Sequence, residues 1–178
     1  MEIPIKDGFK FLKGAIKYHP TTNVPLEYIV KDDAVCLTLF DENLEKVLLV
    51  EQYRPGVDKA TFENVAGIID PGESPYYAIN RELKEETGYN PEDVCDMIEI
   101  RNPMLVDPYM TQFIYFYAAR LKSNDILPGN TDFDEGEDIK SHWVKIDEIE
   151  EYLIDMKTLL AVKYFLPILK EMRVKNEK

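Results

Sequence analysis

Cysteine and histidine are scarce in this sequence. Its 178 residues include two cysteines, Cys36 and Cys95, and two histidines, His19 and His142. Neither cysteine belongs to a Cys-x-x-Cys pair or lies beside a histidine, so the spacing supports neither a disulfide framework nor a zinc site. Each histidine lacks a partner at metal-ligand spacing, and we interpret both as ordinary core or surface residues.

Basic residues are also few. The chain has 21 Lys and Arg against 34 Asp and Glu, which gives a formal net charge of −13 at pH 7. Duplex nucleic acid is bound mainly through Lys and Arg contacts to phosphate, so this balance argues against a general nucleic-acid binder. A small phosphorylated ligand is compatible with the charge if metal ions neutralise that ligand locally.

No segment has the pattern of a membrane span or a secretion signal. The longest apolar run, residues 113–119, is far too short to cross a bilayer. Residues 1–6 lack the apolar core of a signal peptide. We therefore expect a cytoplasmic protein with no membrane partner.

The residues that are present predict one α/β domain over residues 1–178. Hydrophobic residues make up 45% of the chain, enough to build a packed core. Strand-like runs occupy residues 26–31, 34–40, 46–53, 95–101, 111–121 and 142–146. One helix is expected from Ser74 and Pro75 to Gly88, and a second over residues 157–172. This order predicts a mixed sheet with helices, preceded by a short arm or strand pair within residues 1–30.

The most informative stretch is a Gly- and Pro-rich loop that leads into the first helix. On that helix Glu82, Glu85 and Glu86 are three and four residues apart, so their carboxylates lie near one another. Such like-charge pairs destabilise a helix by roughly 0.2–0.5 kcal/mol each, and acids near a helix C-terminus oppose its dipole. A bound Mg²⁺ or Mn²⁺ would offset both costs. The alternative interpretation is a solvated charged helix.

The spacing matches the Nudix box, Gly-x5-Glu-x7-Arg-Glu-U-x-Glu-Glu-x-Gly-U, where U is an aliphatic residue. Its fixed positions are occupied by Gly67, Glu73, Arg81, Glu82, Leu83, Glu85, Glu86 and Gly88, and Tyr89 replaces the final aliphatic residue. The sequence therefore resembles the Nudix hydrolase superfamily. The resemblance implies a Nudix-type α/β/α sandwich with a mixed sheet.

The segments around the box are similar to those of ADP-ribose (ADP-sugar) pyrophosphatases. They are Gln-Tyr-Arg-Pro at residues 52–55, Glu-Asn-Val-Ala-Gly at residues 63–67, and Glu-Gly-Glu-Asp-Ile at residues 135–139. That family more often has Glu-Leu-Pro-Ala-Gly, so Asn64 and Val65 depart from its pattern. The similarity extends over about residues 26–165.

The resemblance implies roles for individual residues. The metal ligands would be the Ala66 carbonyl, Glu73, Glu82, Glu85 and Glu86, with Glu73 alternatively holding the loop by pairing with Arg81. The substrate-binding residues would be Arg54, Glu63 and Arg81, with Arg54 on a diphosphate oxygen. The catalytic set would be Glu82, Glu85, Glu86 and an acid of the long loop at residues 122–138, Glu135 or Glu137, as general base. The alternatives are a solvated loop carboxylate for each of these two acids and a solvated strand-end cation for Arg54.

The implied activity is hydrolysis of the pyrophosphate bond in a nucleoside diphosphate sugar, with Mg²⁺ or Mn²⁺ as cofactor. ADP-ribose, giving AMP and ribose 5-phosphate, is the first expectation. One alternative is a Nudix pyrophosphatase for GDP-mannose or UDP-glucose, and another is a non-catalytic Nudix domain that senses a ligand. The resemblance also implies a homodimer, formed through the arm at residues 1–30.

Overall fold

A mixed sheet of eight strands forms the centre of the computed structural model, which describes residues 12–133 and 138–176. The strands of the sheet are β3 (Ala34–Phe40), β4 (Lys46–Arg54), β5 (Lys59–Glu63), β6 (Val65–Ile68), β7 (Val94–Glu99), β8 (Met104–Leu105), β9 (Phe113–Leu121) and β10 (Lys140–Lys145). The other elements are the strands β1 (Lys13–Tyr18) and β2 (Pro25–Val30), the helices α1 (Pro75–Thr87) and α2 (Met156–Asn176), and the 3-10 turns η1 (Pro91–Asp93) and η2 (Ile146–Glu151). Within the described ranges, no helix is both long enough and apolar enough to cross a membrane.

Strand β3 lies at the centre of the sheet. The strand order is β10-β4-β3-β9-β7, with β5 beside β4, β6 beside β3 and β8 beside β9. β3 runs parallel to β9 over its whole length, and antiparallel to β6 and then to β4 along its other edge. The predicted mixed sheet is therefore confirmed.

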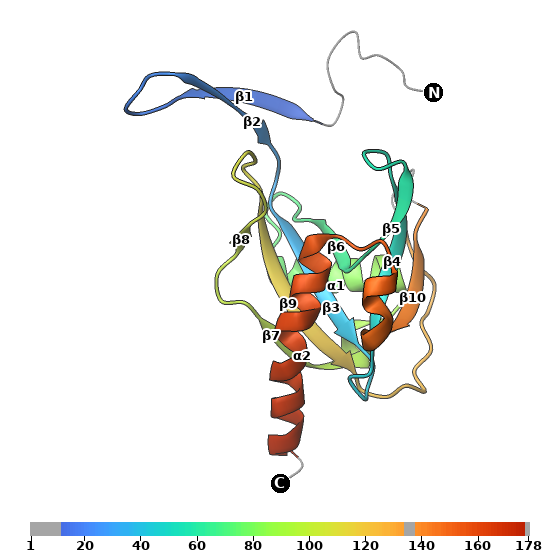
Figure 1. Cartoon of the computed structure of the whole chain (residues 1–178). Helices are drawn as coiled ribbons and strands as arrows, with labels where there is room; N and C mark the ends of the chain where they lie inside the picture. Colours follow the sequence, from blue (N-terminus) through green and yellow to red (C-terminus); the bar gives the residue numbers. More distant parts are fainter. Residues whose placement is uncertain (1–11, 134–137, 177–178) are drawn as a thin grey trace.

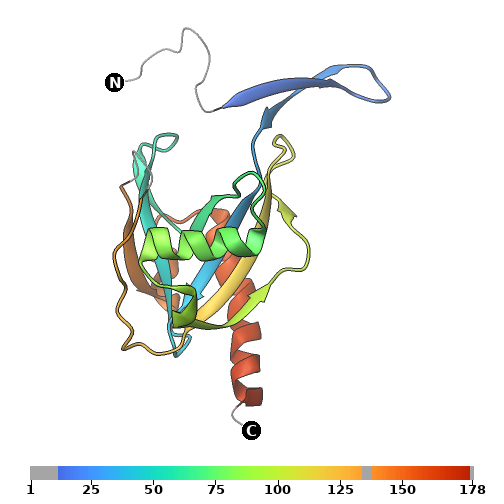
Figure 2. The ribbon, with the colours of Figure 1, turned by 180° about the vertical axis from the view of Figure 1, so that it is seen from behind.

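The two helices cover opposite faces of this sheet. Side chains alternate along a strand, so Val35, Leu37 and Leu39 of β3 pack with α1, whereas Cys36 and Phe40 pack with α2. Figure 1 shows α2 in front of the sheet, and Figure 2, seen from behind, shows α1 across the other face. The predicted α/β/α sandwich is confirmed.

Helix α1 begins and ends where its sequence predicts. The Ser74 hydroxyl accepts a hydrogen bond from the Tyr77 N–H at 3.4 Å, and Pro75 occupies the first turn. At the other end Gly88 has a φ of 75° and donates its N–H to the Lys84 carbonyl at 2.9 Å. A Cβ at Gly88 would also lie 2.3 Å from the Gly129 carbonyl oxygen, so two constraints require glycine there.

The start of α2 is joined to the junction between β5 and β6. An Asp155 carboxylate oxygen accepts the Thr158 N–H at 2.7 Å, which is an N-cap interaction. The Thr158 hydroxyl in turn accepts the Asn64 N–H at 2.9 Å, and the Phe62 N–H donates to the Leu153 carbonyl at 2.9 Å. These bonds bring the first turn of α2 beside residues 62–64, between β5 and β6.

Strands β5, β6 and β8 are not predicted by the sequence. β5 and β6 have five and four residues, separated only by Asn64, and β8 has two. Runs this short carry little periodicity, and pairing with β4, β3 and β9 stabilises them as strands. Residues 122–133, predicted as a loop, contain no helix or strand.

The predicted N-terminal strand pair is present as β1 and β2, which pair antiparallel from Lys13–Val30 to Tyr18–Pro25. The pair extends away from the sheet in both views (Figures 1 and 2). Its base is attached to the body by hydrogen bonds from the Ile29 N–H to the Tyr109 carbonyl, 2.7 Å, and from the Thr111 N–H to the Ile29 carbonyl, 3.0 Å.

Candidate functional site

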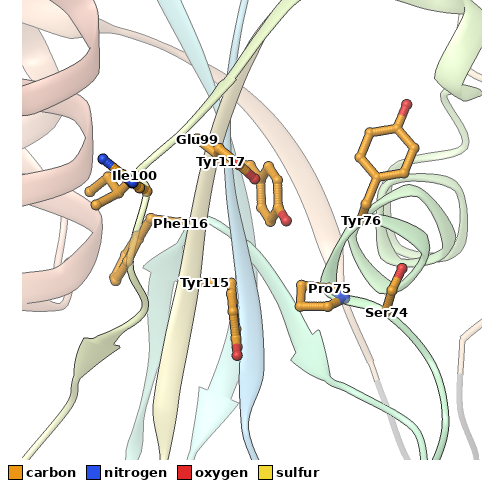
Figure 3. A pocket seen from close by; sticks show the side chains of 9 residues that line it. Ser74, Pro75, Tyr76, Glu99, Ile100, Tyr115, Phe116 and Tyr117 are labelled. Atoms are coloured by element: carbon orange, nitrogen blue, oxygen red, sulfur yellow. The ribbon is translucent and has the colours of Figure 1, made fainter.

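One large pocket contains most of the predicted site residues. It has a volume of about 1560 Å³ and lies where α1, β4, β5, β6 and the start of α2 meet. The predicted residues that line it are Arg54, Glu63, Ala66, Arg81, Glu82, Glu85 and Glu86. A smaller cavity of about 270 Å³ lies between the start of α1 and β9, and Tyr76, Tyr115 and Tyr117 are among the residues that line it (Figure 3). Because the smaller cavity contains none of the predicted residues, we place the site in the larger pocket.

The acidic face of α1 lies against β6. Glu82 and Glu86 are buried despite their charge, at 8% and 6% exposure. One Glu86 carboxylate oxygen accepts the Ala66 N–H at 3.2 Å. At Gly67 an added Cβ would lie 1.8 Å from a Glu82 carboxylate oxygen. The strand and the carboxylates can therefore approach this closely only because residue 67 has no side chain.

Arg81 is the cation at the centre of these acids. Its Nη1 donates to Glu82 at 2.6 Å and to Glu85 at 2.9 Å, while Nε and Nη2 donate to Glu73 at 3.2 and 3.0 Å. Nη2 also donates to the Ile68 carbonyl at 3.0 Å. The hydrogen bonds to Glu73 and Glu82 raise the pKa of Arg81 well above its usual value. Arg81 therefore remains charged and ties the loop to the helix.

The contacts of Glu73 are those of a residue that holds the loop before α1 in place. Besides Arg81, its carboxylate accepts the Asp70 N–H at 3.2 Å, and its own N–H donates to the Asp70 carbonyl at 2.9 Å. The Arg81 hydrogen bonds, helped by the one from Asp70, lower the pKa of Glu73. Glu73 is not among the residues that line the pocket. Its predicted role as a metal ligand stays a prediction.

The composition of this cluster fits a hard divalent cation. Four formal negative charges, on Glu73, Glu82, Glu85 and Glu86, accompany the single positive charge of Arg81, which leaves a formal charge of −3. The acids supply only oxygen donors, which suit Mg²⁺ or Mn²⁺. Within residues 12–133 and 138–176, no three His, Cys, Asp or Glu side chains already converge as a metal site. Three of these carboxylates, those of Glu73, Glu82 and Glu85, are instead oriented toward Arg81.

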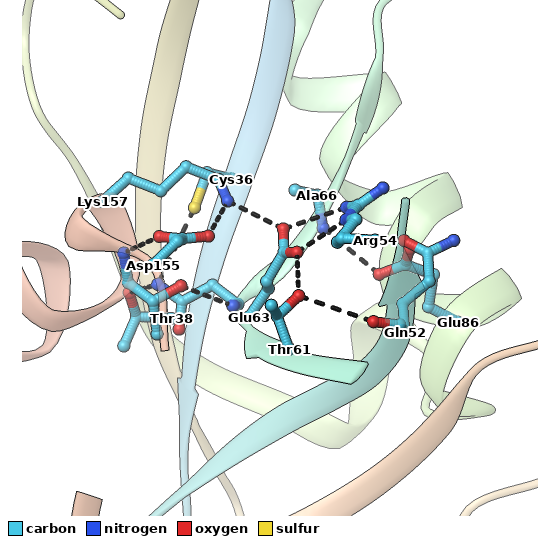
Figure 4. A network of polar contacts seen from close by, with 12 residues as sticks. Cys36, Thr38, Gln52, Arg54, Thr61, Glu63, Ala66, Glu86, Asp155 and Lys157 are labelled. Carbon is cyan, nitrogen blue, oxygen red and sulfur yellow. Dashed lines mark hydrogen bonds and ion pairs between the residues drawn. The ribbon is translucent and has the colours of Figure 1, made fainter. Parts of the chain in front are cut away.

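A second charged group lines the pocket, at the ends of β4 and β5. Arg54, on β4, donates from Nε and Nη2 to the two oxygens of Glu63, at 2.7 and 2.9 Å (Figure 4). Glu63 also accepts the Thr61 hydroxyl at 2.7 Å and Lys157 Nζ at 2.9 Å. Burial alone would raise the pKa of Glu63, but the Arg54 and Lys157 contacts outweigh it and hold that pKa well below its usual range. Glu63 is therefore ionised and shared by two cations.

The sequence did not point to Asp155 or Lys157 as site residues. Both line the pocket and form an ion pair with each other. Asp155 three residues before Thr158 is an N-cap signal for the start of α2. No local signal shows that this turn lies against Glu63, which is 94 residues from Lys157 in the chain.

The loop that follows β9 also reaches the acidic helix. Its Gly129 N–H donates to the Gly88 carbonyl at 2.9 Å, and its Asp132 N–H donates to the Glu85 carbonyl at 3.0 Å. Asp132 lines the pocket, although the sequence did not single it out. The predicted general bases, Glu135 and Glu137, lie outside the described residues.

A profile of the NUDIX domain matches residues 30–162. The chain belongs to the Nudix family of hydrolases. Gly67, the acids of α1 and Arg81 are therefore the folded form of its Nudix box. Hydrolases of this family generally use a divalent metal, in agreement with the negative charge of the cluster.

Two relatives are similar over most of their length. A methanol dehydrogenase activator of Bacillus methanolicus is 31% identical over 142 residues, which cover 76% of this chain and 74% of that protein. An ADP-ribose pyrophosphatase of Bacillus subtilis (strain 168) is 26% identical over 142 residues, with the same coverage of 76% and 74%. A crystal structure of an ADP compounds hydrolase has a TM-score of 0.69 and 20% identity, over 93% of this chain and 90% of that one. The last match shows that the fold is shared.

We expect Gly67→Ala to lower hydrolase activity by roughly a hundredfold, because the new methyl group must displace the Glu82 carboxylate. The melting temperature should change little, since Glu82 is a flexible side chain. Gly56→Ala is the matched control, because an added Cβ there meets no atom within 4 Å. Turnover and thermal unfolding of both variants test this, and full activity of Gly67→Ala would contradict the predicted role of Glu82.

We expect Glu63→Gln to lower the free energy of unfolding at neutral pH by about 2 kcal/mol, because Arg54 and Lys157 lose their shared charged acceptor. Ionised Glu63 stabilises the fold above its unfolded-state pKa of about 4.3, and this contribution is lost as the pH falls toward the lower folded-state pKa. The difference from wild type should therefore be constant at about pH 6–8 and shrink below about pH 4.3. Urea denaturation across this range measures it. A difference that grows in acid would contradict the expectation.

Proposed function

We propose that this Nudix hydrolase is a metal-dependent pyrophosphatase that cleaves a nucleoside diphosphate sugar. The observation that carries the proposal is the presence, in one pocket, of the acidic face of α1 and the Arg54–Glu63 pair. A pyrophosphate bond resists attack because its oxygens are negative and repel a nucleophile. A site for it needs cations around the diphosphate together with acids that hold them.

Different residues would hold the metal and bind the phosphate. When bound, a divalent metal would neutralise the diphosphate and lower the pKa of a bound water. The Ala66 carbonyl, Glu82, Glu85 and Glu86 would hold the metal at the α1 side of the pocket. Arg54 uses Nε and Nη2 on Glu63, and its Nη1 makes no hydrogen bond within the described residues, so that edge can donate to a phosphate oxygen.

The reaction is a hydrolysis in which the oxygen of water bonds to one phosphorus. The bond from that phosphorus to the bridging oxygen breaks, and the bridging oxygen leaves with the other phosphate. A carboxylate must take the proton that the water loses. Glu135 or Glu137 would be this carboxylate, as the resemblance implies.

ADP-ribose is the proposed substrate, with AMP and ribose 5-phosphate as products and Mg²⁺ or Mn²⁺ as the metal. The support is that the relative from Bacillus subtilis is an ADP-ribose pyrophosphatase. The described geometry supports a diphosphate without selecting the base or the sugar. GDP-mannose and UDP-glucose are therefore the competitors to exclude.

The test is hydrolysis of ADP-ribose, GDP-mannose and UDP-glucose, each with EDTA, Mg²⁺ or Mn²⁺. We expect metal-dependent release of AMP from ADP-ribose, well above turnover of the other two. A higher rate on GDP-mannose or UDP-glucose would overturn the proposed substrate, but the proposed metal-dependent hydrolysis of a pyrophosphate bond would stand. Absence of turnover with every compound and metal would favour a ligand-sensing domain.

Within this assay, Glu86→Gln should lose roughly 10²–10³-fold in turnover, the range seen when one group that stabilises transition-state charge is removed. Its melting temperature should stay near that of wild type, because Gln can still accept the Ala66 N–H. Glu92→Gln, in the exposed turn η1, is the matched control and should retain full activity. Near-normal turnover of Glu86→Gln would refute the assigned metal site.

We further infer a homodimer that forms through the strand pair β1–β2. An isolated two-stranded hairpin is marginally stable in water, and this one extends away from the body. Its exposed apolar side chains include Ile16 and Tyr18 on one face and Leu26 and Val30 on the other. A second copy of the chain could cover them.

Light scattering at micromolar concentration should give a dimer mass for the wild type and a monomer mass for Ile16→Lys combined with Leu26→Lys. Buried lysines at these positions would disfavour the contact, whereas the free strand pair already exposes both. A monomeric wild type would end the inference.

A further inference from the structure

Lys157 is a half-buried cation of the pocket that neither the Nudix box nor its flanking segments include. It lies in the first turn of α2, with a side-chain exposure of 25%, and its Nζ is 2.9 Å from Glu63. Burial alone would lower the pKa of Lys157, but the charges of Asp155 and Glu63 outweigh it and raise that pKa. Lys157 is half-buried and paired with two acids at the wall of the pocket, so its charge is held at a fixed place beside Glu63.

The role follows from how the Glu63 carboxylate is held. Arg54 donates to both of its oxygens, Thr61 donates to Oε1 and Lys157 donates to Oε2. In Figure 4 Lys157 and Arg54 approach this carboxylate from different sides. Lys157 adds a charge-assisted bond to the two that Arg54 makes, so rotation of the Glu63 carboxylate costs more than with Arg54 alone. The Arg54 fork that Glu63 holds is therefore kept in one orientation.

Charge leads to the same conclusion. A bidentate Arg54–Glu63 pair alone is formally neutral and attracts a diphosphate weakly. Lys157 shares the Glu63 charge and leaves Arg54 more electropositive. Asp155 would cancel this gain, but its carboxylate also accepts the Thr158 N–H at the N-terminus of α2, where the helix dipole offsets negative charge.

We propose that Lys157 is a positioning residue that acts through Glu63 to orient Arg54 and to keep it electropositive for a substrate phosphate. The inference rests on the proposed pyrophosphatase function for its effect on substrate, while the effect on Arg54 stands on the contacts alone. It also gives α2 a part in the site, because the Thr158–Asn64 and Leu153–Phe62 bonds hold Lys157 against Glu63.

The kinetic test uses Lys157→Met, which keeps the length of the side chain and removes its charge. We expect the KM for ADP-ribose to rise about tenfold, with kcat within about twofold of wild type, because the residue acts on binding through Arg54. Lys157→Arg should restore most of the KM. Lys170→Met, on the exposed face of the same helix, should behave as wild type. An unchanged KM in Lys157→Met would overturn the proposal.

A double-mutant cycle separates positioning from general stability. In an Arg54→Gln background, Lys157→Met should raise KM by less than about twofold, because the residue it acts through is gone. Equal effects in both backgrounds would show that Lys157 acts without Arg54, and would also overturn the proposal. Lys157→Gln is the replacement variant if Lys157→Met does not fold.

A substrate-free measurement keeps this inference distinct from the proposed function. The ¹⁵N resonance of Arg54 Nε should be sharp and exchange slowly with water in the wild type, because Glu63 holds that N–H. In Lys157→Met it should shift and exchange faster. If the wild type fails to hydrolyse ADP-ribose, the substrate proposal fails while this readout still decides the positioning. An Arg54 resonance identical in both proteins would overturn it.

Discussion

The burial of β3 on both faces is the constraint on which the rest of the structure depends. All seven of its residues are buried, and side chains on alternate faces pack with α1 and with α2. A strand with no polar face must be covered on each side, so one helix is required on each. Because β3 also pairs with β6, the same strand brings the Gly67 backbone beside the acids of α1.

The pocket that results has charges of opposite sign on different elements. On the α1 side, carboxylates outnumber the single guanidinium of Arg81, so this wall attracts cations. On the side of β4 and α2, Arg54 and Lys157 share Glu63. A protein with a formal net charge of −13 can accept an anionic ligand only where such local positive charge exists. Arg54 and Lys157 therefore supply positive side chains for the diphosphate substrate that we propose.

Much of the fold could be predicted where the determining interactions are local. Ser74, Pro75 and Gly88 set the ends of α1 through hydrogen bonds within a few residues, and the helical spacing placed Glu82 and Glu86 together. The short strands β5 and β6 were not predicted. They are stabilised by pairing with β4 and β3, and their own residue pattern is too short to indicate a strand. The roles of Glu135 and Glu137 stay predictions.

The sequence by itself determined the box, the helix that carries it and the excess of acid around Arg81, since each depends on residues close together in the chain. Only the tertiary structure decided which cation neutralises which acid across the pocket. Glu63 meets Lys157 because α2 packs on β3 and its first turn bonds to Asn64, a contact that spans 94 residues. No local pattern encodes such a contact, because packing of the whole sandwich creates it.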